Sequence, residues 1–292
     1  MGERFASAPE VAEALAGVGY VADPHIASVV YLADRLEKPV LVEGPAGTGK
    51  TQLAKSVAEM TGARLIRLQC YEGLDEAKAL YEWNYRKQLL RIQVERDTDG
   101  ATDWAAVHDD IFAEEFLLAR PLLEAIRAEE PVVLLVDEVD RLEVETEALL
   151  LEVLSEHQVS IPELGTVRAT RIPLVFLTSN NSRELSEALK RRCLFLHLDY
   201  PPPERERAIV TARLPGIAEH LAEQVVRVVR SLRQLDLRKH PSVSETLDWA
   251  AALMLLGVDR VGADEVRATL HVLLKYQVDI ARAAKELAVE GP

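Results

Sequence analysis

The sequence predicts an α/β protein in which helices flank a parallel sheet, followed by a smaller all-α domain. Three observations lead to this fold class. A glycine-rich loop at residues 44–51 lies between a short apolar run and a helical pattern. The continuous apolar runs at residues 132–136 and 172–177 are typical of strands buried on both faces. Beyond the three prolines at residues 201–203, every periodic segment is helical.

The first half of the chain predicts alternating helices and strands, in the order helix 11–16, a helix capped by Asp23, strand 39–42, the helix after the glycine-rich loop, and strand 63–69. An Asp followed by proline is a frequent helix start, because its carboxylate accepts a hydrogen bond from the first turn. Further on, the polar residues 95–103 predict an exposed loop, and residues 112–128 predict a helix.

The second half predicts strand 132–136, helix 142–156, a hairpin within 158–170, and the buried strands 172–177 and 194–198. Strands separated by helices imply parallel pairing with crossover helices. Consecutive prolines interrupt both helix and central strand. We therefore divide the chain into an α/β domain, 1–200, and a C-terminal helical domain, 201–292, with helices 204–213, 217–235, 244–256 and 263–288.

The composition is that of a soluble globular protein. Apolar residues make up 48% and charged residues 28% of the 292 residues. The 34 basic and 48 acidic residues give a net charge of −14, which argues against a broad nucleic-acid-binding surface. The two cysteines and seven histidines lack the spacing of a disulfide framework or metal site. With no secretion-signal pattern and no bilayer-length apolar run, we expect a cytoplasmic protein without an integral membrane segment.

The glycine-rich loop matches the phosphate-binding pattern G-x-x-x-x-G-K-[ST] at every fixed position. Its glycines let backbone N–H groups surround phosphate oxygens, and the following helix N-terminus adds partial positive charge. Lys50 is expected to reach the β- and γ-phosphates, and the Thr51 hydroxyl to bind magnesium. The alternative is a glycine-rich turn without a ligand, which the flanking strand and helix disfavour. We therefore expect a nucleoside triphosphate at Gly44, Pro45, Ala46, Gly47, Thr48, Gly49, Lys50, Thr51 and Gln52, with magnesium at Thr51.

Asp137 and Glu138 follow the apolar run 132–136. A carboxylate at the carboxyl end of a central strand lies beside the phosphate loop, because ligands bind there in open α/β sheets. Asp137 would hold magnesium through water alongside Thr51. Glu138 would orient and polarise the attacking water. A solvated strand end is the alternative. A kinase of a small molecule would need a substrate-binding acid elsewhere, so the Asp-Glu pair favours hydrolysis.

A polar amide follows the apolar run 172–177. Asn180 would hydrogen-bond the γ-phosphate or the attacking water, because its strand is expected to end beside Asp137. Asn181 is the alternative candidate. A cap on the turn after the strand, without any contact to a ligand, is the third interpretation.

Together these segments resemble the nucleotide-binding core of AAA+ ATPases, which have the P-loop NTPase fold. The resemblance rests on the motifs above and on the stretch 187–193 that follows them. Residues 149–165 resemble the helix and hairpin that mark the MoxR-type branch. Residues 70–85 look closest to the CoxD-like subset, which is encoded beside carbon-monoxide-dehydrogenase and related molybdenum-enzyme genes. The resemblance covers residues 20–257.

The resemblance implies a homo-oligomeric ring, usually a hexamer, with ATP between neighbouring subunits. An arginine of one subunit then reaches the neighbour's γ-phosphate. Arg192 matches that position, with Arg191 as the alternative and a surface basic pair as the third interpretation. A second sensing arginine, frequent in the family at the start of the third lid helix, is missing, and Arg238 or Lys239 just upstream are the candidates. Tyr71 falls where many such rings carry an aromatic substrate-gripping loop, or else it is a buried tyrosine.

In functional terms, the resemblance implies an ATPase that acts as a chaperone or remodeller and matures or activates a partner metalloenzyme. A partner protein with a von Willebrand A domain is expected as well. Two alternatives come from other classes: an AAA+ motor acting on nucleic acid, which the net charge of −14 opposes, and a P-loop kinase of a small metabolite. An assay without an acceptor separates the kinase from the ATPase.

Overall fold

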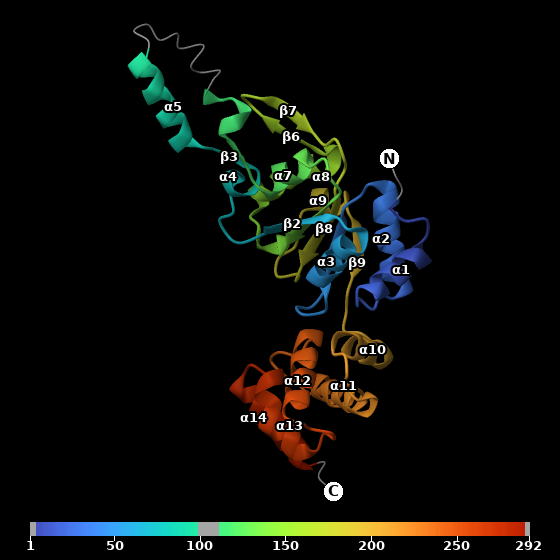
Figure 1. The fold of residues 1–292 in the computed structure, drawn as a ribbon. Coiled ribbons are helices and arrows are strands. Elements are labelled where there is room, and N and C mark those ends of the chain that lie inside the picture. The colour runs from blue at the N-terminus through green and yellow to red at the C-terminus, as the bar shows by residue number, and fades with distance from the viewer. Residues whose placement is uncertain (1–3, 99–110, 290–292) are drawn as a thin grey trace.

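The computed structural model describes residues 4–98 and 111–289. Five parallel strands form the central sheet in the order β2-β5-β8-β1-β9. Their bounds are β1 Val40–Glu43, β2 Arg64–Gln69, β5 Val132–Asp137, β8 Leu174–Ser179 and β9 Leu194–His197. The predicted α/β fold with a parallel sheet is confirmed. The carboxyl ends of these strands face the C-terminal helices (Figure 1).

Helices cover both faces of the sheet. One face packs against α1 (Ala8–Gly17), α2 (Pro24–Leu36) and α3 (Lys50–Thr61). The other packs against α7 (Pro121–Arg127), α8 (Val144–Glu156) and α9 (Glu187–Lys190). β5 and β8 are buried along their whole length, as their continuous apolar runs predict. Asp23 caps α2 as expected, its carboxylate accepting from Ile26 N at 2.8 Å.

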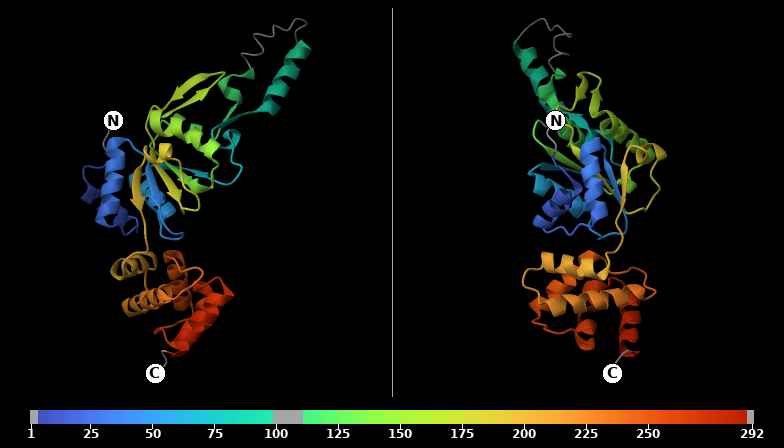
Figure 2. Two further views of the ribbon diagram at one scale, coloured as in Figure 1. Left: turned by 180° about the vertical axis from the view of Figure 1, so that it is seen from behind. Right: turned by 90° about the vertical axis from the view of Figure 1, so that its right-hand side faces the viewer.

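The C-terminal region is helical and is set off from the α/β part (Figure 2). It comprises α10 (Pro203–Arg213), α11 (Glu219–Gln234), α12 (Val243–Leu255), α13 (Ala263–Leu273) and α14 (Gln277–Val289). These helices share their own hydrophobic core around the fully buried Trp249, whose Nε1 donates to Thr269 Oγ1 at 2.7 Å. A separate core is typical of a domain. The division into domains 1–200 and 201–292 stays a prediction.

Two expectations for residues 95–128 are wrong. Helix α5 (Tyr85–Thr98) continues through residues 95–98, which were expected in a loop, and residues 99–103 lie outside the described part. Residues 112–128 are not one helix, because η1 (Glu114–Phe116) and β4 (Leu117–Ala119) precede α7. β4 pairs in antiparallel fashion with β3 (Tyr81–Trp83), which follows the short α4 (Glu76–Ala79). Local periodicity could not predict β4, since its partner strand is distant in the sequence.

Two further expectations need correction. β9 is not buried on both faces, because it lies at the end of the strand order beside β1, where Phe195 is 56% exposed. The segment 263–288 is broken around residues 274–276 into α13 and α14. The hairpin is confirmed as β6 (Gln158–Ile161) and β7 (Gly165–Arg168). Within the described ranges, no helix is long and apolar enough to cross a membrane.

Candidate functional site

The phosphate loop joins β1 to α3 and is packed tightly on both sides. Gly47 has a φ of 74°, in the left-handed region that favours glycine. A Cβ on Gly47 would lie 2.2 Å from Oγ of Ser242, the N-cap of α12, and one on Gly44 would lie 2.0 Å from the Leu198 carbonyl oxygen. Ser244 N also donates to the Gly47 carbonyl at 3.3 Å. The loop is therefore held between the sheet and the N-terminus of α12.

Lys50 begins α3, and its amine is turned back into the loop. Its Nζ donates to the carbonyl oxygens of Gly44 and Pro45, both at 2.7 Å. Burial lowers the pKa of Lys50, although the carboxylates of Asp140 and Asp137 act in the opposite direction. The two carbonyls keep a desolvated ammonium group hydrogen-bonded. The same amine can turn to phosphate oxygens, with which it would form stronger, charge-assisted hydrogen bonds.

Asp137 ends β5, and its buried carboxylate is the centre of a polar cluster. Oδ1 accepts from Thr51 Oγ1 at 2.9 Å and from Thr178 Oγ1 at 2.5 Å, while Oδ2 accepts from Arg67 at 2.5 Å. A hydroxyl beside a carboxylate suits magnesium, which commonly combines one or two carboxylates with substrate phosphates. Among the described residues no three His, Cys, Asp or Glu side chains group into a metal site. Thr51 and Asp137 fit a magnesium ion that arrives with a nucleotide.

Glu138 follows in a left-handed backbone conformation, with a φ of 58°. Its backbone N donates to Thr178 Oγ1 at 2.9 Å, which ties the turn to β8. Its carboxylate accepts from Gln69 Nε2 at 3.2 Å and forms an ion pair with Arg141, whose Nε lies 2.7 Å from Oε2. The carboxylate is only partly buried and lines the cavity beside the phosphate loop. Such a group can accept a proton from water once those two partners release it.

The structure separates Asn180 from Asn181. Asn180 lines the same cavity as Glu138. Asn181, with a φ of 58°, lines a different cavity beside β9. The turn is held by Asp140, whose Oδ2 accepts from Ser182 N at 2.9 Å and from Ser182 Oγ at 2.6 Å. Of the two amides, Asn180 is the one placed to contact a phosphate or a water molecule.

These groups line one cavity of about 320 Å³. Of the predicted residues, it brings together Ala46, Gly47, Gly49, Lys50, Thr51, Gln52, Asp137, Glu138 and Asn180. The sequence reasoning missed four residues of its lining, namely Lys55, Arg67, Thr178 and Ser244. Thr178 could have been found because it lies on β8, two residues before Asn180, which directly follows that strand. Arg67 and Ser244 carry no such local signal, because strand pairing and domain packing bring them here.

A second cavity of about 170 Å³ shares Gly47, Gly49, Gln52 and Ser244 with the first. The rest of its lining comes mainly from the segment before α2 and from α10 and α12, including Tyr20, Val21, Arg205, Ile209, Val243 and Leu247. Burial raises the pKa of Tyr20, and Arg205 is paired with Asp23. A mostly apolar pocket beside a phosphate site can hold a nucleobase. The sequence reasoning missed this pocket because its walls are far apart along the chain.

Arg192 lies outside the lining of both cavities. It follows α9 and precedes the end strand β9. Its Nη1 donates to the Ala188 carbonyl at 2.8 Å, and its Nε donates to Ser155 Oγ. Arg191 is exposed and is likewise absent from the lining of the two cavities. A role for Arg192 in a neighbour's site, with Arg191 as the alternative, stays a prediction.

Arg238 and Lys239, the two candidates for a second sensor, also lie outside the two cavities. The Arg238 guanidinium lies over the Tyr276 ring, 4.5 Å from its centroid, and the Lys239 amine lies 3.4 Å from a Glu245 carboxylate oxygen. Neither residue lines the two cavities, whereas Ser244 lines both. Among the described residues of the C-terminal helices, Ser244 is therefore the one that lines the cavity at the phosphate loop.

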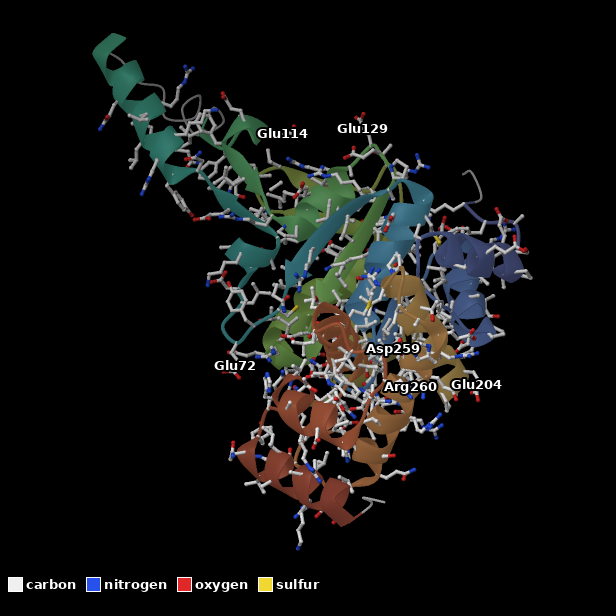
Figure 3. The ribbon with its side chains drawn as sticks, turned by 60° about the horizontal axis from the view of Figure 1, so that its bottom comes forward. Glu72, Glu114, Glu129, Glu204, Asp259 and Arg260 are labelled. Carbon is white, nitrogen blue, oxygen red and sulfur yellow. The ribbon has the colours of Figure 1, made fainter. Side chains whose placement is uncertain are left out.

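Tyr71 follows β2 and is 43% exposed, so the interpretation as a buried tyrosine is wrong. The Lys78 amine lies 5.9 Å from the centroid of its ring. Glu72 marks the tip of this loop, on the side of the α/β part that faces the C-terminal helices, and Glu114 and Glu129 lie at the opposite end (Figure 3). Contact of Tyr71 with a substrate chain stays a prediction.

A family model, the AAA domain of the dynein-related subfamily, matches residues 39–193. This range contains the phosphate loop together with Asp137, Glu138 and Asn180. The chain belongs to this AAA family. The assignments to the MoxR-type branch and to its CoxD-like subset are finer than the match and stay predictions.

Several known proteins are similar to this AAA chain. The gas vesicle ATPase GvpN of Ancylobacter aquaticus is 28% identical over 245 residues, which are 78% of this chain and 64% of that protein. The denitrification regulatory protein NirQ of Pseudomonas aeruginosa is 25% identical over 250 residues, 82% of this chain and 85% of that protein. The GvpN of Haloferax mediterranei is also similar, and the chain covers 57% of it. The chain therefore spans less than two thirds of the length of both GvpN proteins. The Thermotoga maritima RuvB Holliday junction branch migration motor has a TM-score of 0.48 and 18% identity, covering 85% of this chain and 67% of that one.

Proposed function

We propose that the chain is a MoxR-type AAA+ ATPase that hydrolyses ATP to ADP and phosphate and remodels a partner protein. The observation that carries this proposal is the single cavity shared by Lys50, Thr51, Asp137, Glu138 and Asn180. Phosphoryl transfer to water needs these parts: a phosphate-binding cation, ligands for magnesium, a carboxylate that orients water, and a polar contact to the γ-phosphate. Membership of the AAA family supports the same activity.

In this proposal ATP spans both cavities. The loop N–H groups and Lys50 hold the phosphates, and the smaller cavity between Tyr20 and Leu247 holds the base. Because α10 and α12 contribute to the lining, bound nucleotide would contact both the α/β part and the C-terminal helices. A ligand that contacts both the α/β part and the C-terminal helices favours the arrangement in which these two parts are close together. Nucleotide binding and release would thus move the C-terminal helices.

Hydrolysis would use residues of two subunits of a homo-oligomeric ring, which we propose to be a hexamer. Magnesium held by Thr51 and Asp137 would neutralise phosphate charge when bound. Glu138 would leave its partners Gln69 and Arg141 and accept a proton from the attacking water. The guanidinium of a neighbour's Arg192, or of Arg191, would stabilise the charge of the transition state.

The activity is tested by phosphate release without an added acceptor, which a metabolite kinase would require. Lys50→Ala should abolish ATP binding, because the phosphate cation is lost. Glu138→Gln should bind ATP and lower turnover by about 100-fold or more, the usual contribution of a general base. Glu143→Gln is the matched control, since Glu143 is an exposed N-cap of α8 outside the cavity lining. Weak ATP binding by Glu138→Gln, or full turnover by it, would contradict these roles.

The client is proposed from the resemblance of residues 70–85 to the CoxD-like subset. We propose a metalloenzyme that the chain matures or activates as a cytoplasmic chaperone, with a von Willebrand A domain protein as partner. The relatives are named for gas vesicles and for regulation of denitrification, so they do not specify the client. Tagged Glu138→Gln with ATP should capture both proteins, and Lys50→Ala should not. Equal capture by the two variants would argue against an ATP-dependent client.

A further inference from the structure

We propose that Arg67 is a built-in counter-ion of Asp137 and competes with magnesium for its carboxylate. This inference rests on the proposed function, since it concerns the same site. The contact that carries it joins Arg67 Nη2 to Asp137 Oδ2 at 2.5 Å. Both residues line the cavity that also contains Lys50 and Thr51. None of the sequence motifs includes Arg67.

The position of β2 explains how Arg67 reaches the site. β2 lies at the end of the strand order, beside β5, and its register places Gln69 opposite Asp137 and Arg67 opposite Leu135. Residues two apart in a strand lie on the same face. Arg67 accordingly donates to Gln69 Oε1 as well as to Asp137, and Gln69 Nε2 donates to Glu138 at 3.2 Å. β2 therefore brings a cation to the metal-binding carboxylate from the edge of the sheet.

Burial of Asp137 makes that cation necessary in the nucleotide-free protein. The Asp137 side chain is 3% exposed, and a buried carboxylate is costly without a compensating charge. The hydroxyls of Thr51 and Thr178 satisfy Oδ1 but carry no charge. The Lys50 amine is directed to two loop carbonyls, both at 2.7 Å. Among the described residues, Arg67 is the cation that donates a hydrogen bond to this carboxylate.

Magnesium needs the same carboxylate, bound directly or through water. A divalent ion beside Asp137 would repel the guanidinium, because two positive charges would lie within a few ångströms of each other at one buried carboxylate. The Arg67 side chain is 46% exposed, so it can turn toward solvent or toward bound phosphates at small cost. The ion pair with Arg67 therefore raises the magnesium concentration at which nucleotide and metal bind together.

The test measures ADP binding by calorimetry over a series of free magnesium concentrations. In Arg67→Met, which keeps an unbranched stem without charge, the magnesium midpoint should fall by about two- to fivefold, the scale of a partly exposed ion pair. Arg67→Lys keeps a charge and should stay nearer to the wild type. Arg64→Met is the matched control, because Arg64 lies on the same strand and pairs with Glu124 and Glu130 outside the cavity lining. Its midpoint should not move.

An unshifted or higher midpoint in Arg67→Met would overturn the inference while leaving the proposed function intact. An equal fall in Arg64→Met would also overturn it, since general surface charge would then be the cause. If Arg67→Met is unfolded by circular dichroism, Arg67→Gln takes its place with the same expected fall. Absence of ADP binding by the wild type at every magnesium concentration would overturn the proposed function, and this inference with it.

Discussion

Replacing Gly47 by alanine tests how closely α12 packs against the phosphate loop. The left-handed conformation of Gly47 costs a residue with a Cβ about 1–2 kcal/mol. The new Cβ would also lie 2.2 Å from Ser242 Oγ and 2.6 Å from Ser242 Cβ, so the loop or α12 must shift. Because the proposed phosphate contacts are made by the loop N–H groups, we expect ADP binding to weaken at least about tenfold, which corresponds to about 1.4 kcal/mol.

A second substitution separates the two causes. Ser242→Gly removes the two atoms that would lie within 3 Å of the new Cβ and leaves only Ser244 Oγ, at an ordinary contact distance of 3.4 Å. Glycine in place of serine at an N-cap costs only a few tenths of a kcal/mol. The double variant Gly47→Ala with Ser242→Gly keeps the backbone strain but loses the clash. We therefore expect partial recovery of ADP affinity, with a coupling free energy of about 0.5–3 kcal/mol, as is usual for residues in contact.

Calorimetric titration with ADP would be carried out on the wild type, both single variants and the double variant, with thermal melting as the check on folding. Ser242→Gly alone should bind ADP almost as the wild type does. Wild-type affinity in Gly47→Ala would refute the close packing of α12 against the phosphate loop. Strictly additive effects of the two substitutions would show that α12 does not rest on Gly47 in solution.

Three further predictions concern assembly, the C-terminal helices and the thiols. Arg192→Ala should bind ATP but hydrolyse little, and mixing it with Glu138→Gln subunits should restore some phosphate release; inactivity at every ratio would contradict a role in the neighbour's site. A fragment of residues 1–200 should fold poorly or bind ATP weakly, because α10 and α12 line the cavities. Circular dichroism and ATP titration would contradict this prediction if the fragment folds and binds ATP as tightly as the whole chain. Burial raises the pKa of the Cys70 and Cys193 thiols to about 12, from 9.0 in the exposed state. The folded state therefore holds these two protons more tightly than the unfolded state does. The resulting contribution to the free energy of unfolding is complete below pH 9 and is lost as the pH rises toward 12. Urea midpoints should fall across that range, and a flat profile would contradict the thiol burial.

The sequence by itself determined the features whose signals are local. The phosphate loop is recognisable because its function depends on a contiguous spacing between a strand and a helix. β5 and β8 are predictable because strands buried on both faces are continuous apolar runs. Asp137 and Asn180 could be assigned to one site because the carboxyl ends of parallel strands meet at one edge of a sheet. Their common cavity is the arrangement that this rule predicts.

Only the tertiary structure decided which distant side chains complete the site. Arg67 meets Asp137 because β2 pairs with β5, and no periodicity within either strand encodes that pairing. Ser244 reaches the phosphate loop because α12 packs on Gly47, a contact between segments remote in the sequence. Phe195 is exposed because β9 is the end strand, whereas its apolar composition suggested burial. Helix α5 projects from the body (Figure 2). Most of its residues 85–93 are exposed, so this part of the helix lacks the packing against a core that gives most helices an apolar stripe. Local spacing specifies the backbone of each element, but the neighbours of an element depend on the packing of the whole chain.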